Sequence, residues 1–335
     1  MAWPDAVERA VLDALPGAFW LTDEALPGAR PAAALTHRWD VAQALAAEGV
    51  AVQWADYPAD FVADGSQDRV VLRVPKEKAL ALHWLDCAGR WLKPGGELVL
   101  VGRKSEGAPS LIKRVRGAWD RPGTVTNHGP WRVARFVRGP RVEALGDGDY
   151  ARIRPVAERH GVALLSKPGV FAWKGVDAGT EALLALLERR GLAPRGAWAD
   201  LGCGSGLLAA WLAARGADSV LATDSSAAAL MATGATLRPW FDRVQLAPSD
   251  AGAGLPGGHA GILSNPPFHR GFETDRDLTD AFVAAARAML APDGEAWFVV
   301  NAFVPVPDAA AAHFGVCQLV EDDKRYRIYR LAEPR

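Results

Sequence analysis

Short apolar runs alternate with longer Ala- and Leu-rich segments through the second half of the chain. Each short run is followed within three residues by glycine, proline or an acid, and such runs predict buried strands. Four of them are residues 196–201, 219–223, 244–246 and 260–263. The longer segments predict helices, among them residues 181–190, for which Thr180 or Asp177 could be the N-cap, and residues 207–215. Strands that alternate with helices indicate an α/β fold with a parallel sheet.

The first half of the chain shows the same kind of pattern without a recognisable ligand loop. Residues 32–49 are Ala-rich and predict a helix, residues 69–74 a strand and residues 76–92 a helix. The segment 92–101 aligns with 290–299, because both have the sequence Leu-x-Pro-x-Gly-Glu. In both copies an Ala-rich predicted helix comes directly before this segment. We interpret this as a distant internal duplication, although helix–Pro-Gly–strand corners are also common in α/β proteins.

In this alignment the two copies differ where chemistry is expected. The first copy has Arg-Val-Pro-Lys at 73–76 where the second has Ser-Asn-Pro-Pro at 264–267. The first copy therefore lacks the ligand motifs of the second and is interpreted as degenerate.

The composition is that of a globular protein. The 335 residues suffice for two domains, half of them are hydrophobic, and the formal net charge is -1. No basic segment followed by an apolar core begins the chain, and no apolar run reaches about 20 residues, so we expect no signal peptide and no membrane span. The three cysteines form no Cys-x-x-Cys pair. An odd, unpaired set favours reduced thiols in the cytoplasm and argues against a metal site.

A glycine-rich loop follows the predicted strand 196–201. Asp200 stands near the end of that strand, and Gly202, Gly204 and Gly206 come directly before a predicted helix. Glycines let a ligand approach the backbone, and the helix N-terminus offers N–H groups, so this pattern is typical of a nucleotide-type site. A carboxylate beside the loop would not favour a dinucleotide pyrophosphate. It would be tolerated by a cofactor with an ammonium and a sulfonium group, such as S-adenosyl-L-methionine.

Acids also end the next two predicted strands. Asp224 follows the second strand, where a carboxylate can take both hydroxyls of a ribose. Asp250 follows the third strand, where it could meet an adenine amine. NAD-binding folds share only the glycine loop and the acid after the second strand, so the further acids favour the methyl-donor cofactor.

The fourth strand ends in Asn265-Pro266-Pro267-Phe268. Two prolines cannot continue a central strand, and the residue before a proline is held in an extended conformation. The resulting stiff loop suits a planar group that carries an –NH2, because the Asn265 side-chain oxygen and the Pro266 carbonyl can each accept one N–H. Phe268 can stack on the attached ring. An ordinary Asn-Pro turn is the alternative.

Residues 103–154 are strongly basic. They hold twelve Lys or Arg against five acids, with Trp119, His128, Trp131 and Phe136 interleaved. Such a mixture predicts an RNA-facing surface, and a merely solvated strand face is the alternative. The basic residues are Arg103, Lys104, Lys113, Arg114, Arg116, Arg121, Arg132, Arg135, Arg138, Arg141, Arg152 and Arg154.

These motifs resemble those of the bacterial ribosomal RNA guanine-N2 methyltransferases, which are class I S-adenosylmethionine-dependent enzymes. The segments 168–171, 177–180, 200–206, 264–269 and 301–305 occur in that family's order. The resemblance implies two tandem Rossmann-like domains, each with a seven-stranded, mostly parallel sheet. Residues 1–160 would be the degenerate, RNA-binding or structural domain and residues 161–335 the catalytic one. It also implies that Phe171, Thr180 and Ser225 help to bind the cofactor.

The implied activity is N2-methylation of a guanosine in ribosomal RNA, with 16S rRNA or the small ribosomal subunit favoured as partner. Three alternatives remain open at this point. The first is the sister type that acts on 23S rRNA. The second is a related enzyme that methylates DNA adenine or a protein glutamine. The third is a non-catalytic RNA-binding assembly factor that retains the cofactor pocket.

Overall fold

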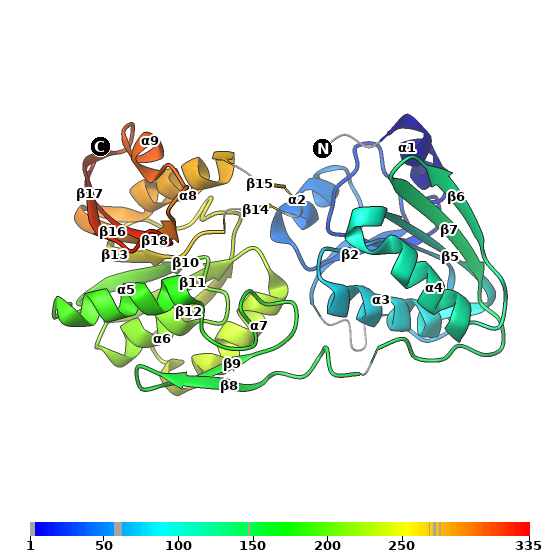
Figure 1. The fold of residues 1–335 in the computed structure, drawn as a ribbon, viewed down its shortest axis with the longest axis horizontal. Coiled ribbons are helices and arrows are strands. Elements are labelled where there is room, and N and C mark those ends of the chain that lie inside the picture. Colours follow the sequence, from blue (N-terminus) through cyan, green and yellow to red (C-terminus); the bar gives the residue numbers. More distant parts are fainter. Residues whose placement is uncertain (1–3, 57–61, 147, 268, 271–272, 275) are drawn as a thin grey trace. The chain divides into compact units, whose positions relative to one another are not determined.

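A computed structural model describes residues 4–56, 62–146, 148–267, 269–270, 273–274 and 276–335 (Figure 1). The chain divides into two compact units, residues 1–152 and 153–335, here called the N-terminal and C-terminal units. The expected boundary after residue 160 falls in the turn of a hairpin that belongs to the C-terminal unit. Among the described residues, no helix is long and apolar enough to cross a membrane.

The N-terminal unit is built on a seven-stranded sheet in the order β3-β2-β1-β4-β5-β7-β6. Its first five strands are parallel, and β7 and β6 are antiparallel. Its elements are α1 (Asp5–Leu12), β1 (Phe19–Leu21), β2 (Ala33–Thr36), α2 (Trp39–Ala47), β3 (Val52–Trp54), β4 (Gln67–Arg73), α3 (Lys78–Trp91), β5 (Leu92–Arg103), η1 (Lys104–Glu106), α4 (Ala108–Ala118), β6 (Thr124–His128) and β7 (Trp131–Val137).

The C-terminal unit repeats this arrangement in the order β12-β11-β10-β13-β16-β18-β17, preceded by the hairpin β8–β9. Its elements are β8 (Arg154–Arg159), β9 (Val162–Ser166), α5 (Ala178–Arg189), β10 (Ala197–Leu201), α6 (Leu207–Ala214), β11 (Ser219–Asp224), α7 (Ala227–Thr236), η2 (Arg238–Trp240), β12 (Val244–Pro248), β13 (His259–Ser264), β14 (His269–Arg270), β15 (Glu273–Thr274), α8 (Arg276–Met289), β16 (Leu290–Asn301), α9 (Val306–Ala310), β17 (Phe314–Asp322) and β18 (Tyr326–Pro334). The predicted pair of Rossmann-like domains is confirmed, and the matching strand orders agree with the interpretation of an internal duplication.

The strand register corrects the expected alignment of the two copies by one residue. Leu100 of β5 corresponds to Phe298 of β16 through the shared Leu-x-Pro-x-Gly-Glu segment. Leu100 pairs with Leu72, and Phe298 pairs with Ser264. Arg73 therefore takes the position of Asn265, whereas the sequence alignment had placed Arg73 opposite Ser264.

The prediction of one helix over residues 32–49 was wrong in its first part. Ala33–Thr36 is the strand β2, which pairs with β1 and β3, and the helix α2 begins only at Trp39. Alanine favours a helix in isolation, but a place between two parallel strands overrides that preference.

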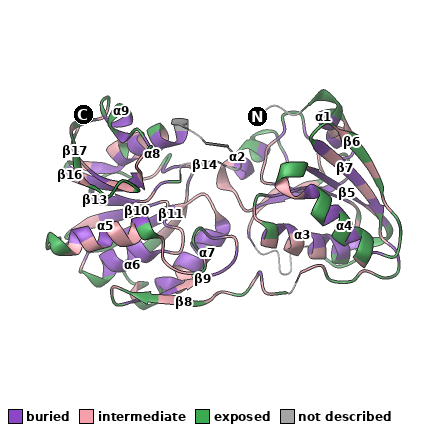
Figure 2. Cartoon of the chain, in the orientation of Figure 1, coloured by how far each residue is buried: buried purple, intermediate pink, exposed green. Residues whose placement is uncertain are grey.

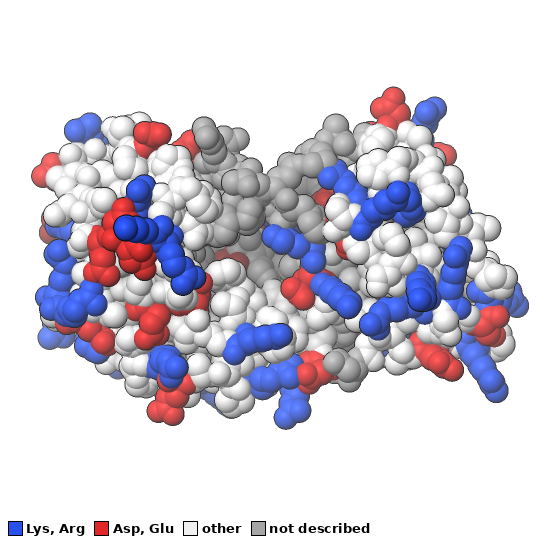
Figure 3. Space-filling view, viewed as in Figure 1, with Lys and Arg blue, Asp and Glu red and all other residues white. Residues whose placement is uncertain are grey.

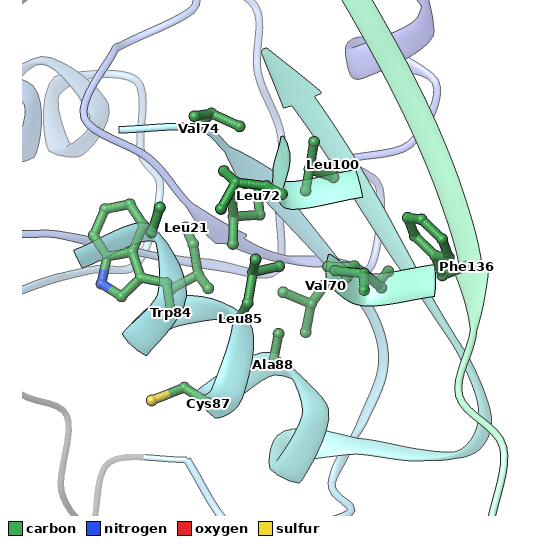
Figure 4. Close-up of a cluster of buried hydrophobic side chains, with 14 of the residues drawn as sticks. Leu21, Val70, Leu72, Val74, Trp84, Leu85, Cys87, Ala88, Leu100 and Phe136 are labelled. Atoms are coloured by element: carbon green, nitrogen blue, oxygen red, sulfur yellow. The ribbon is translucent and has the colours of Figure 1, made fainter. Parts of the chain in front are cut away.

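Each unit has its own apolar core between sheet and helices (Figure 2). In the N-terminal unit, Trp84, Leu85 and Ala88 of α3 face Leu72 and Leu100 of the sheet, and all five are fully buried (Figure 4). In the C-terminal unit the corresponding cluster joins α8 and α9 to β10, β13 and β16. These cores fix the sheets, and the sheets position the loops at their strand ends.

Candidate functional site

Four adjacent parallel strands of the C-terminal unit end at the same edge of the sheet. They are β12, β11, β10 and β13, and the residues at their ends are Asp250, Asp224, the loop after Asp200 and Asn265. Ligands of open α/β sheets bind at the carboxyl ends of the strands. The residues that the sequence singled out are thus brought to the place where this fold class binds ligands.

The glycine loop is held in a conformation that suits glycine. Gly202, Gly204 and Gly206 all have positive φ, of 83°, 56° and 83°. A Cβ on Gly206 would lie 2.9 Å from Thr233 Cγ2, whereas one on Gly204 would meet nothing within 4 Å. Thr233 Oγ1 of α7 donates to the Gly204 carbonyl at 2.9 Å and so fastens the loop to that helix. The loop is packed on its helix side and open at Gly204.

Asp200 is a fully buried acid beneath this loop. Its Oδ2 accepts from the Ala209 N–H in α6 at 2.9 Å, and Oδ1 has no hydrogen-bond partner among the described residues. Burial raises the pKa of Asp200 to about 7, opposed by the Ala209 N–H and reinforced by the charge of Asp224. Burial also raises the pKa of Cys203 well above its usual value, which keeps this thiol protonated.

Asp224 connects the ends of two strands. One carboxylate oxygen accepts from the Gly204 N–H at 3.0 Å and the other from the Ser226 N–H at 2.9 Å. A carboxylate has about four acceptor sites, so each of its oxygens can accept from more than one donor. Ser225 lies between Asp224 and Ser226 in the sequence and is half-buried, and Asp250 at the next strand end is half-buried as well.

This set of groups fits S-adenosylmethionine better than a dinucleotide. Three carboxylates, those of Asp200, Asp224 and Asp250, stand at consecutive strand ends, which suits a cationic ligand with ribose hydroxyls and disfavours a pyrophosphate. The orphaned Oδ1 of Asp200 adds a buried acceptor beneath the open glycine loop. Among the described residues, no group of three or more His, Cys, Asp or Glu could hold a metal ion.

The Asn265 side chain is fixed from one side. Its Nδ2 donates to Asp177 Oδ1 at 2.8 Å and to Thr180 Oγ1 at 2.9 Å, so both amide hydrogens are used. Ser264, one residue earlier, donates through Oγ to the Leu201 carbonyl at 2.6 Å and ties the end of β13 to that of β10. Within the described part of the chain, no donor reaches the Asn265 amide oxygen.

The rest of this loop is only partly described. Pro266 is buried and Pro267 is exposed, so the second proline stands at the surface of the site. Phe268, which the sequence assigned to base stacking, lies outside the described residues.

Two residues expected to bind the cofactor have different surroundings. Thr180 supports the Asn265 amide, a contact that the sequence did not predict. Phe171 is 66% exposed and follows Val170, which packs on Ala228 and Ala232 of α7.

Asp177, expected only as a possible N-cap, does cap α5 and also contacts Asn265. No sequence signal marked this second role, because Asp177 and Asn265 are far apart along the chain.

The basic segment 103–154 separates into two kinds of residue in the structure. Trp119, Trp131 and Phe136 are buried, so the expected aromatic component of an RNA surface is wrong for these three side chains. Arg135 pairs with Glu97, and Arg138 donates to the Gly89 carbonyl. Three of the exposed cations lie on α4, which has no acid, and Figure 3 shows Lys and Arg side chains on the face of the N-terminal unit. These three are Lys113, Arg114 and Arg116.

Comparison with known proteins agrees with this geometry. The Methyltransferase small domain family matches residues 161–330, and the Methyltransferase small domain N-terminal family matches residues 21–125. Ribosomal RNA small subunit methyltransferase C of Shewanella halifaxensis is 32% identical over 268 residues, which cover 79% of this chain and 77% of that protein. The protein of the same name from Hahella chejuensis is 30% identical over 300 residues, or 87% of this chain and 85% of that protein.

A solved structure extends the match to nearly the whole chain. It is the T. thermophilus 16S rRNA N2 methyltransferase RsmC, named for guanosine 1207 and solved with AdoMet and guanosine. The two chains are 28% identical, the TM-score is 0.84, and the match covers 99% of this chain and 92% of that one. The family matches and the relatives together show that the chain belongs to the methyltransferase small domain family, which includes the ribosomal RNA small subunit methyltransferase C proteins.

Proposed function

We propose that this protein transfers a methyl group from S-adenosylmethionine to the exocyclic N2 of a guanosine in 16S rRNA. The observation that carries the proposal is the Asn265 amide, whose two hydrogens are bound by Asp177 and Thr180 beside three strand-end carboxylates. An amide held in this way offers an acceptor to an incoming amine. The solved structure named for 16S rRNA and the relatives named for small-subunit ribosomal RNA support this RNA over 23S rRNA, DNA or protein.

The chain's own contribution to the reaction is mainly positioning. When bound, S-adenosylmethionine supplies an electrophilic methyl group on its sulfonium. Guanine N2 is a poor nucleophile, since its lone pair is delocalised into the ring. The Asn265 oxygen and the Pro266 carbonyl each accept one N–H, which favours a pyramidal nitrogen with its lone pair aimed at the methyl group. Such positioning can lower a barrier by about 7–11 kcal/mol.

A strong general base is not required. The N2 proton becomes acidic once the nitrogen carries the new methyl group, and it then passes to solvent. The target base has to leave its stack to reach a loop at a strand end.

The cofactor contacts follow from the residues at the same edge. We assign Asp224 to the ribose hydroxyls, Asp250 to the adenine amine and the Gly202–Gly206 loop to the methionine end. The half-buried carboxylates and the open space at Gly204 support these assignments. We also assign the exposed ring of Phe171 to one wall of the cofactor site.

The N-terminal unit is assigned to RNA capture. Three exposed cations on α4, Lys113, Arg114 and Arg116, support this role, since phosphate contacts supply most of the affinity for nucleic acids. In the N-terminal unit α4 follows β5, and in the C-terminal unit α9 follows the equivalent strand β16. Unlike α4, α9 contains an acid, Asp308, and no cation. The proposed partner is the small ribosomal subunit or its RNA, which implies action in the cytoplasm.

Mass-spectrometric mapping of 16S rRNA tests the proposed function. Cells that lack the protein should lose one N2-methylguanosine, at the position equivalent to guanosine 1207, and the wild-type protein should restore it. Asn265→Ala should not restore it. An unchanged 16S rRNA with a lost methyl group in 23S rRNA, DNA or protein would overturn the proposal. Unchanged methylation throughout would instead indicate a non-catalytic assembly factor.

A further inference from the structure

We propose that Asp177 is a positioning residue that determines which end of the Asn265 amide faces the substrate amine. The inference deepens the proposed function and rests on it, because it concerns the acceptor that Asn265 presents. Asp177 lies 88 residues before Asn265 in the sequence, and its carboxylate contacts the amide directly.

The Asp177 carboxylate is itself held in place. Its Oδ1 caps α5 by accepting from the Gly179 N–H at 2.9 Å and the Thr180 N–H at 3.0 Å. The same oxygen accepts from Asn265 Nδ2 at 2.8 Å. A Cβ on Gly179 would lie 3.0 Å from both Asp177 Oδ1 and the ring of Tyr326, so the cap is closely packed. One fixed oxygen therefore links the start of α5 to the Asn265 loop.

The chemistry of the two partners gives Asp177 the deciding role. A side-chain amide has a donor end and an acceptor end of nearly equal size, so packing alone cannot orient it. The Thr180 hydroxyl can donate or accept and is compatible with either orientation. An ionised carboxylate only accepts, so it bonds Nδ2 and repels the amide oxygen. With Asp177 in place, Asn265 Oδ1 points away from α5.

An Asn265 amide with its oxygen and nitrogen exchanged would not support the proposed reaction. It would present –NH2 to the guanine amine, and two donors would then face each other. It would also place the Asn265 oxygen against the Asp177 carboxylate, leaving two acceptors without a proton between them. Asp177 thus acts through Asn265 and needs no contact with the substrate.

Two substitutions separate this role from helix capping. In Asp177→Ser the hydroxyl can still cap α5, since Ser is as good an N-cap as Asp. The serine side chain is about one bond too short to reach Asn265. Asp177→Asn keeps an oxygen that can cap α5 and accept from Nδ2. We expect Asp177→Ser to lower the single-turnover rate about tenfold or more, since a hydrogen bond to a charged group is removed. Asp177→Asn should stay close to wild type, and both should keep wild-type melting temperature and cofactor affinity.

A double-mutant cycle completes the test. Adding Asp177→Ser to Asn265→Ala should cause no further loss of rate, because the residue through which Asp177 acts is already gone. Additive losses, a wild-type rate for Asp177→Ser, or a loss of rate matched by a loss of folded protein would overturn the proposal. If the wild-type protein shows no methylation of this RNA, the proposed function fails. If Asn265→Ala alone has a wild-type rate, the role of Asn265, and with it that of Asp177, fails. If it is slow while Asp177→Ser is fast, only the positioning role fails.

Discussion

Arg73 Nη2 lies 2.7 Å from Glu24 Oε1 in the N-terminal unit, and these two residues take the places of Asn265 and Gly204. Glu24 comes three residues after the end of β1, as Gly204 comes three after the end of β10. Arg73 also donates to Glu106 Oε1 at 2.8 Å. An ion pair thus joins the two loops between which the C-terminal unit is proposed to hold its cofactor. We therefore expect the N-terminal half to bind no S-adenosylmethionine.

Arg73→Ala should destabilise the N-terminal unit strongly. The side chains of Arg73 and Glu106 are each only 2% exposed, and removing one partner of a buried pair costs about 3–5 kcal/mol. Arg69→Ala on the same strand is the matched control. Its pair with Glu97 is about a third exposed, so we expect a loss of about 1 kcal/mol or less. Urea unfolding curves measure both, and equal losses would refute this interpretation of Arg73.

Much of this architecture could be predicted from the sequence because strands, glycine loop and prolines are local signals. The duplication was visible through the shared Pro-x-Gly-Glu corner, but its register was displaced by one residue. Register depends on which residues pair across β4 and β5, and this pairing has no local signature. The contact between Asp177 and Asn265 was missed for the same reason. The burial of Trp119, Trp131 and Phe136 was missed because aromatic rings suit both a core and an RNA surface.

Asp200 should make folding stability pH-dependent. Its pKa is raised by burial from 3.8 to about 7, so between these values the folded state binds a proton that the unfolded state has lost. The contribution of Asp200 to the free energy of unfolding is therefore fully present below about pH 4 and is lost as the pH rises toward 7. Asp200→Asn should remove this decline. Melting temperatures of both proteins between pH 4 and 8 give the difference, and parallel curves would contradict the raised pKa.

Asp224→Ala should weaken S-adenosylmethionine binding without unfolding the protein. A hydrogen bond from a ribose hydroxyl to a carboxylate is worth about 1.5–3 kcal/mol, which corresponds to about tenfold or more in affinity. Isothermal titration calorimetry should give one site per chain in the wild type and a weaker one in the variant. A melting curve serves as the control, since Asp224 also bonds the Gly204 and Ser226 N–H groups. Unchanged affinity would remove Asp224 from the ribose role.

Replacing Lys113, Arg114 and Arg116 by Ala should weaken RNA binding and flatten its salt dependence. Every phosphate that the variant no longer neutralises should reduce the slope of log affinity against log salt by about 0.7–0.9. A matched control removes Arg189, Arg215 and Arg243, which are cations of the C-terminal unit that each pair with an acid. The overall charge changes equally, but the control should bind RNA like wild type. Equal weakening by both variants would mean that α4 is only a solvated face.

The single-turnover rate of Asn265→Ala on 16S rRNA or the small subunit tests the central claim most directly. The interaction of Asn265 with the amine strengthens as the nitrogen becomes pyramidal, so its loss should lower the rate strongly and leave cofactor affinity and melting temperature near wild type. Removing one such preorganised hydrogen-bonding group typically costs about 10²–10³ in rate. An Asn265→Ala protein that is folded, binds S-adenosylmethionine normally and methylates RNA at the wild-type rate would contradict the proposed mechanism.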